Sequence, residues 1–206
     1  LWNAFIDSLA DMHNVKARDF SFGKHGDGST RAVVEHWRAG LLDALRGSAA
    51  PLQIAVLDWL AQTAPTLPAS EPAVCMADTR LPNAIFHEGA VTALIDFEIA
   101  YIGDPLLDIA YALYIHDCFA QIAGGDLEGI PTPDETLARW SAKTGRTMTH
   151  RKFWDLLAGI VISVTAARAI RILIDNQMMP ADALDNEEGF NIYASRLRPI
   201  LERSDD

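Results

Sequence analysis

Apolar residues recur at helical spacing through most of this 206-residue chain, and one short stretch in the middle breaks the pattern. Trp2, Phe5, Leu9 and Met12 form one apolar stripe, which predicts an amphipathic helix over residues 1–14. Similar stripes, bounded by capping residues, Pro and Gly, predict further helices over residues 30–47, 51–61, 105–118, 133–143, 150–176 and 181–203. The chain is therefore expected to be mainly helical.

The interruption predicts short strands over residues 73–77, 84–87 and 91–96. Glu88-Gly89 is a plausible two-residue hairpin turn, which would place His87 opposite Ala90. We therefore predict an α+β class, mainly α with a small β hairpin or sheet. A regular ladder would place Asp96 opposite Leu81.

The composition suits one domain, or one lobe of a larger domain, with enough chain to bury a core. A formal net charge of −11 argues against nonspecific binding to nucleic acid or to an anionic membrane surface. The most apolar run, Leu156–Ala167, is too short to span a bilayer. Cys75 and Cys118 form no metal-binding or disulfide pattern, so we expect two reduced, buried thiols in a cytoplasmic protein.

The predicted hairpin brings three polar side chains to one end: Asp78, Asn83 and Asp96. An Asn carbonyl and an Asp carboxylate are hard oxygen ligands that suit Mg²⁺, and a carboxylate held off the metal can take a proton from an attacking hydroxyl. Ordinary turn chemistry is the alternative, because Asp78 and Asn83 could each form an Asx turn. The spacing alone leaves both interpretations open.

Other polar residues have simpler explanations. Asp104 precedes Pro105 and is expected to cap a helix, and Asp108 would favour the first turn of that helix through the helix dipole. Glu98 could reach a second metal or remain solvated. The six histidines show no metal-ligand spacing and fit surface or packing roles: His13, His25, His36, His87, His116 and His150.

Three motifs together resemble the aminoglycoside phosphotransferase family of small-molecule kinases, which has a protein-kinase-like fold. They are M-A-D-T-R-L-P-N over residues 76–83, then I-D-F-E, and G-D-P-L-L-D-I-A. The resemblance covers about residues 1–115. It implies that Asp78 is the catalytic base, that Asn83 and Asp96 bind Mg²⁺, and that Asp108 anchors the catalytic loop through backbone N–H groups.

The chain departs from the family pattern at two adjacent positions, where Met76 replaces a His that supports the loop and Ala77 replaces a Gly. The family's N-terminal lobe would precede residue 1, so we expect the whole chain to be a C-terminal lobe. It divides into a helical part after the hinge (1–70), the catalytic loop and metal-binding hairpin (73–98) and a second helical part (104–206).

The resemblance implies an ATP- and Mg²⁺-dependent phosphotransferase that acts on a hydroxyl of a small molecule. The motifs look most like the branch of the family associated with acyl-CoA dehydrogenases, which favours a metabolite as the acceptor. A catalytically silent binding or regulatory module is the alternative, and Met76 supports it. We expect neither nucleic acids nor membranes as partners. The face toward the other lobe would be exposed in this chain, and we consider a homodimer that forms through this face.

Overall fold

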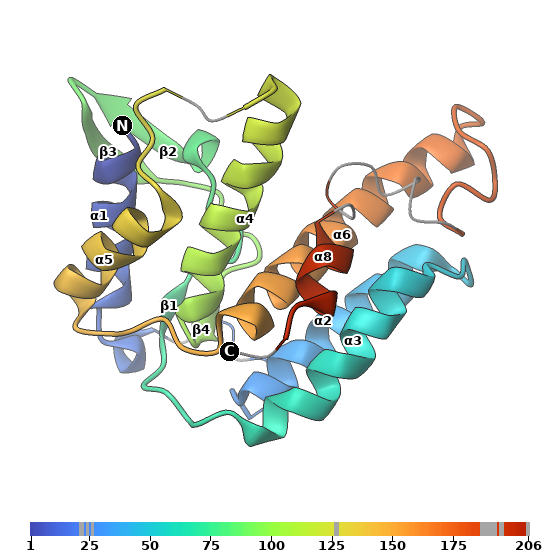
Figure 1. Ribbon diagram of the computed structural model, residues 1–206, viewed down its shortest axis with the longest axis horizontal. Helices are drawn as coiled ribbons and strands as arrows, with labels where there is room; N and C mark the ends of the chain where they lie inside the picture. The colour runs from blue at the N-terminus through green and yellow to red at the C-terminus, as the bar shows by residue number, and fades with distance from the viewer. Residues whose placement is uncertain are drawn as a thin grey trace.

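The structure is a computed structural model that describes residues 1–20, 23, 25, 27–125, 128–185, 193 and 196–204. Its α-helices follow the predicted stripes (Figure 1), with these bounds: α1 Trp2–His13, α2 Thr30–Leu45, α3 Pro51–Thr63, α4 Leu106–Ala123, α5 Pro133–Thr144, α6 Arg151–Asp175 and α8 Leu197–Glu202. Three short 3₁₀ helices lie between them: η1 Ala17–Asp19, η2 Ala64–Thr66 and η3 Leu81–Asn83. The mainly helical α+β class is confirmed.

The helix ends lie where the capping residues predict. The Ser29 hydroxyl accepts a hydrogen bond from the Ala32 N–H at the start of α2. The Asp104 carboxylate accepts one from the Leu106 N–H at the start of α4, so Asp104 caps that helix as expected. Gly145, in the left-handed conformation, ends α5. Local sequence therefore sets most of the helix boundaries.

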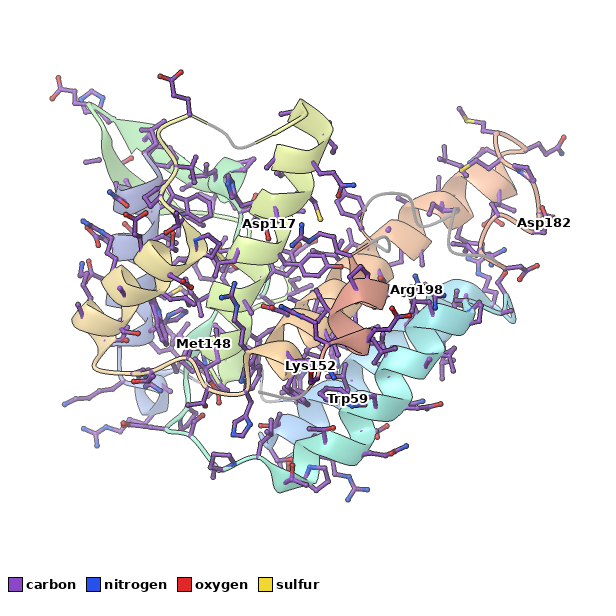
Figure 2. The ribbon with its side chains drawn as sticks, in the orientation of Figure 1. Trp59, Asp117, Met148, Lys152, Asp182 and Arg198 are labelled. Atoms are coloured by element: carbon purple, nitrogen blue, oxygen red, sulfur yellow. The ribbon has the colours of Figure 1, made fainter. Side chains whose placement is uncertain are left out.

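The helices form two groups on either side of α4 (Figure 1). α1 packs against α5, whereas α6 packs against α2, α3, α4 and α8. Between α3 and α6, the Lys152 ammonium lies 4.9 Å from the centre of the Trp59 ring. Both residues are labelled in Figure 2. Cys75 and Cys118 are buried free thiols, as predicted.

The helix α6 is longer than its most apolar run suggests. Over 25 residues it is long and apolar enough, by length and composition, to cross a membrane. Half of its apolar window is buried inside the protein, and its neighbours are other helices. A core helix of this kind meets the same criterion, and α6 is the central packing element of its helix group.

Four strands pair as two separate antiparallel sheets, where the sequence predicted one. The strand β2 (Ala84–His87) pairs with β3 (Ala90–Leu94), and β1 (Ala73–Cys75) pairs with β4 (Tyr101–Gly103). The prediction missed β4 because its three residues show no alternation and pair with a distant segment. The β1–β4 ladder fixes the start of the loop that follows β1 against the start of α4.

The hairpin turn is confirmed, but its predicted register is wrong beyond Phe86. Glu88 and Gly89 both have positive φ angles, 49° and 83°, as a type I′ turn requires. His87 pairs with Ala90, and a bulge between Ile85 and Phe86 then shifts the ladder by one residue. Asp96 therefore does not fall opposite Leu81, as an unbroken ladder would have placed it.

The last predicted helix, over residues 181–203, is also partly wrong. Residues 181–185 form turns, and the helical residues among those described in this range are Tyr193 and Leu197–Glu202. Of the rest of that range, residues 186–192 and 194–195 lie outside the described part of the chain. Between the helices predicted over residues 1–14 and 30–47, positions 21, 22, 24 and 26 lie outside the described part too.

Candidate functional site

The loop after β1 is fixed to the first turn of α4 by Asp108. This carboxylate is fully buried and accepts hydrogen bonds from the backbone N–H groups of Met76, at 2.7 Å, and Ala77, at 2.9 Å. The Thr79 hydroxyl donates to the backbone carbonyl of Asp108 at 2.6 Å. The loop thus has three hydrogen bonds to one residue, and Asp108 lies where the family resemblance puts a loop anchor.

His13 completes this arrangement, and the sequence prediction assigned it no such role. Its Nε2 lies 3.1 Å from Asp108 Oδ2, and its Nδ1 lies 2.9 Å from the Trp140 Nε1–H. Because an indole N–H can only donate, Nδ1 is the acceptor and Nε2 carries the proton that is donated to Asp108. The available signal was position: His13 extends the apolar stripe of α1, and a buried polar group requires a partner.

Ala77 adopts a left-handed backbone conformation, with φ of 64°. The family pattern has Gly here, and Gly adopts this region without the steric cost that a Cβ brings, roughly 1–2 kcal/mol. Ala77 and Met76 are both fully buried. The chain therefore keeps the loop conformation that the family's Gly would favour, at some cost in strain.

Asp78 follows directly, and four side-chain contacts orient it. The Tyr111 hydroxyl donates to Oδ1 at 2.8 Å. Arg80 reaches Oδ2 with Nε at 3.0 Å and Nη2 at 2.9 Å, and Asn83 Nδ2 donates to the same oxygen at 2.8 Å. The Asp78 side chain is 14% exposed. It is thus held in one orientation while remaining open to solvent on one side.

Tyr111 remains a donor to this carboxylate over the ordinary pH range. Burial raises the pKa of its hydroxyl, and the negative charge of Asp78 raises it further. Tyr111 lies three residues after Asp108 on α4, so the same helix positions both the loop backbone and the Asp78 side chain. Neither Tyr111 nor Arg80 was singled out from the sequence.

Asn83 and Asp96 come from adjacent ends of the hairpin. The backbone carbonyl of Asn83 accepts a hydrogen bond from the Ile95 N–H at 2.9 Å, and Asp96 is the next residue after Ile95. Asn83 Nδ2 donates to both the backbone and the carboxylate of Asp78, which leaves its Oδ1 available as a ligand. Asp96 is exposed and has a φ of 68°, a strained conformation of the kind found at functional sites.

These contacts distinguish the two interpretations of the motif. In an Asx turn, the side-chain oxygen accepts the N–H two residues ahead. Within the described residues, Asp78 and Asn83 form no such bond, because the Asn83 side chain bonds to Asp78 instead. The local-turn alternative is therefore not what organises this loop.

A larger metal cluster has no support. Among the residues that the structure describes, no group of three or more His, Cys, Asp or Glu side chains could hold a metal ion. Glu98 is exposed beside Asp96, and its role at a second metal remains a prediction. The donor set that fits one hard cation is the Asn83 amide oxygen with the Asp96 carboxylate.

A protein-family model described as the phosphotransferase enzyme family matches residues 1–126, well over half of the chain. The chain belongs to the phosphotransferase enzyme family. The description of the family names its members as phosphotransferases. Asp78, Asn83, Asp96 and Asp108 all lie within the matched residues.

Curated relatives of this phosphotransferase family member are much longer proteins. Acyl-CoA dehydrogenase family member 11 of Gallus gallus is 33% identical over 111 residues, which are 52% of this chain and 14% of that protein. Acyl-CoA dehydrogenase family member 10 of Mus musculus is 30% identical over 161 residues, 70% of this chain and 14% of that protein. The chain thus spans about a seventh of these relatives.

Two solved structures share the fold. A protein from Ralstonia eutropha described as an aminoglycoside phosphotransferase superposes with a TM-score of 0.71 at 24% identity. A choline/ethanolamine kinase family protein from Mesorhizobium loti superposes with a TM-score of 0.61 at 13% identity. Each comparison covers 98% of this chain and 62% of the other, which confirms the aminoglycoside-phosphotransferase-like kinase fold.

Proposed function

We propose that this protein transfers the γ-phosphoryl group of ATP to a hydroxyl of a small molecule, with Asp78 as the base. The observation that carries the proposal is the fixed Asp78 carboxylate, hydrogen-bonded to Asn83. Asn83 in turn pairs with the strand that leads to Asp96. A base and two hard oxygen ligands are the parts that phosphoryl transfer requires of this lobe.

The two oxygens of Asp78 are not equivalent. Oδ2 accepts from both Arg80 and Asn83, whereas Oδ1 accepts only from Tyr111. A carboxylate oxygen has two lone pairs, so Oδ1 retains one for the acceptor hydroxyl. In the proposed reaction the acceptor oxygen bonds to the γ-phosphorus, the bond from that phosphorus to ADP breaks, and Oδ1 takes the hydroxyl proton.

The Asn83 amide oxygen and the Asp96 carboxylate would hold Mg²⁺. The Asp96 carboxylate makes no hydrogen bond or ion pair with any described residue, so it is available to a cation. A magnesium ion there would offset the charge of the phosphate oxygens. Exposed Ile95 and Phe97 flank Asp96, which supports the proposal that a nucleotide and a second lobe cover this edge.

The proposed acceptor is a metabolite rather than an antibiotic. This rests on similarity to proteins named as acyl-CoA dehydrogenase family members, and on the motif form that the chain shares with that branch. The proposed acceptor class is therefore tested with a panel of hydroxyl-bearing metabolites and one aminoglycoside as the comparison.

The test uses the complete gene product and measures Mg²⁺-dependent ADP release across that panel, with nucleotide binding measured by calorimetry. Asp78→Asn should lower kcat by about 10²–10⁴-fold and leave nucleotide affinity nearly unchanged, because the base acts on the acceptor proton. Asp96→Asn should weaken Mg-nucleotide binding as well. Asp58→Asn, which removes an exposed carboxylate at a surface ion pair, is the matched control and should change neither.

Two results would refute the proposal. Full activity in Asp78→Asn would show that Asp78 is not the base. An unmutated gene product that neither binds Mg-nucleotide nor consumes ATP would favour the silent module, which Met76 at the family's His position independently suggests. The 206-residue chain, assayed beside it, is expected to bind Mg-ATP only at about millimolar concentrations, because one lobe encloses little of a nucleotide.

A further inference from the structure

A cavity of about 720 Å³ lies apart from the proposed catalytic site. Its walls are the end of α1 with the residues that follow it (13–18), the loop before β1 (67–72) and the α5–α6 connection (144–150). Figure 2 marks this connection with Met148. Asp78, Asn83 and Asp96 do not line the cavity. A ligand held there would therefore contact none of these three side chains.

The charge of the cavity lining is opposite to that of the chain. The chain carries 28 acidic and 17 basic residues. Lys16, Arg18 and Arg146 line the cavity from two different walls, against two carboxylates, Glu71 and Asp104. Asp104 is already engaged by the Leu106 N–H. A local excess of cationic side chains in an acidic protein favours an anion at this place over the rest of the surface.

Arg146 is positioned in advance for such a ligand. Its Nη1 donates to the Glu71 backbone carbonyl at 2.6 Å, and its backbone N–H donates to the Thr144 hydroxyl at 3.2 Å. The side chain is half-buried, and among the described residues no group accepts from its remaining guanidinium N–H groups. A pre-oriented guanidinium loses less side-chain entropy when it binds a phosphate or carboxylate.

The rest of the lining has two kinds of surface. Leu67, Leu106 and Trp154 provide apolar side chains, whereas Ser70, Thr149 and the exposed His150 provide polar ones. The C-terminal ends of α1 and α5 also border the cavity, and their dipoles would repel an anion. Leu106 and His150, at the N-terminal ends of α4 and α6, line the cavity too, so the helix dipoles oppose one another and an anion is expected to bind the basic side chains.

We propose that this cavity is a second binding site, which takes a small molecule with a phosphate or carboxylate group on an apolar body. The anionic group would bind Arg146 and Lys16, and the apolar body would lie on Leu67 and Trp154. The 720 Å³ volume is in the usual range for sites that enclose small ligands. The catalytic loop takes no part in this binding.

The test is calorimetry on the 206-residue chain with phenyl phosphate as the probe. Benzoate has the other anionic group, and benzyl alcohol has the same ring without charge. Phenyl phosphate should bind with a Kd on the order of 1 mM or tighter, and more weakly at high salt. Benzyl alcohol should bind at least about tenfold more weakly.

Three variants locate the binding. Arg146→Gln should weaken phenyl phosphate binding about tenfold, Arg146→Lys should recover part of it, and Lys16→Gln should weaken it a few-fold. Arg46→Gln, which removes an exposed cation paired with Asp175, is the control and should have no effect. Asp78→Asn should leave this binding unchanged, so failure of the proposed kinase function does not affect the result.

Several results would overturn the proposal: no binding of either anion, equal binding of benzyl alcohol, or unchanged affinity in Arg146→Gln with an intact fold. The near-ultraviolet circular dichroism of each variant checks the fold. A preference between phenyl phosphate and benzoate identifies which of the two anionic groups the site takes.

Discussion

Replacing Asp108 with Asn tests whether one carboxylate holds the catalytic loop to α4. Asp108 accepts three hydrogen bonds, from Met76 N–H, Ala77 N–H and His13 Nε2–H. Asn has one side-chain oxygen, so its NH₂ group must face at least one of these donors in either orientation. A buried donor that loses its acceptor costs about 1–3 kcal/mol, and hydrogen bonds to an uncharged acceptor are roughly half as strong. The two effects together give about 2–5 kcal/mol.

This loss is large beside the total stability of a typical domain, roughly 5–15 kcal/mol. Urea denaturation of the 206-residue chain, followed by tryptophan fluorescence, measures the free energy of unfolding. Asp104→Asn is the control, because Asp104 caps α4 with one hydrogen bond and Asn caps helices about as well as Asp. It should change stability by less than about 0.5 kcal/mol. A loss below about 1 kcal/mol in Asp108→Asn would show that the anchor is not needed for the fold.

Three further changes have defined outcomes. Burial, and next the charge of neighbouring His36, lowers the pKa of His25 from 6.5 to about 4, so the folded state favours the neutral ring. The free energy of unfolding should therefore be highest above about pH 6.5 and decrease as the pH falls toward 4. Denaturation midpoints measured against pH should fall less steeply in His25→Phe, and an unchanged pH dependence would refute this role of His25. Gly159→Ala adds a Cβ that would overlap the Leu197 side chain and the Tyr114 hydroxyl, so thermal unfolding should show about 1–3 kcal/mol of destabilisation despite the better helix propensity of Ala. A variant more stable than the unmutated chain would refute this packing. Tyr111→Phe removes a hydroxyl from the proposed base, so steady-state kinetics should show kcat about tenfold lower with the KM for ATP unchanged, and an unchanged kcat would mean that the base needs no such orientation.

Local signals predicted the helices because each signal acts within one turn. The Ser29 cap, the left-handed Gly145 and the apolar stripes need no knowledge of the tertiary structure. The strand β4 (Tyr101–Gly103) has no equivalent signal, since its three residues are held by distant segments: they pair with β1, and the Ile102 N–H donates to the Gly23 carbonyl. The bulge beside Phe86 was missed for a related reason, because counting residues from a turn assumes an unbroken ladder.

The candidate site was predictable where a motif fixes the spacing. Asp78 and Asn83 lie five residues apart in one loop, and a short hairpin returns the chain to Asp96. Tyr111 and His13 contribute through contacts across 33 and 95 residues of sequence, to Asp78 and Asp108 respectively. No local pattern marks such residues, apart from the general requirement that a buried polar group has a partner.

The hydrogen bonds from Trp140 through His13 to Asp108 have a fixed direction, and this limits the substitutions that these three positions can tolerate. The indole N–H can only donate and the carboxylate can only accept, so the imidazole between them accepts at Nδ1 and donates at Nε2. A substitution at one of these positions therefore removes a hydrogen-bond partner of its neighbour. Phe at position 140 would leave the Nδ1 of His13 without its donor, and Leu at position 13 would leave the Trp140 N–H without its acceptor and remove one of the two donors to Asp108 Oδ2. In related sequences these three positions should therefore be inherited together, and any lineage that lost one of them should show a compensating change at another.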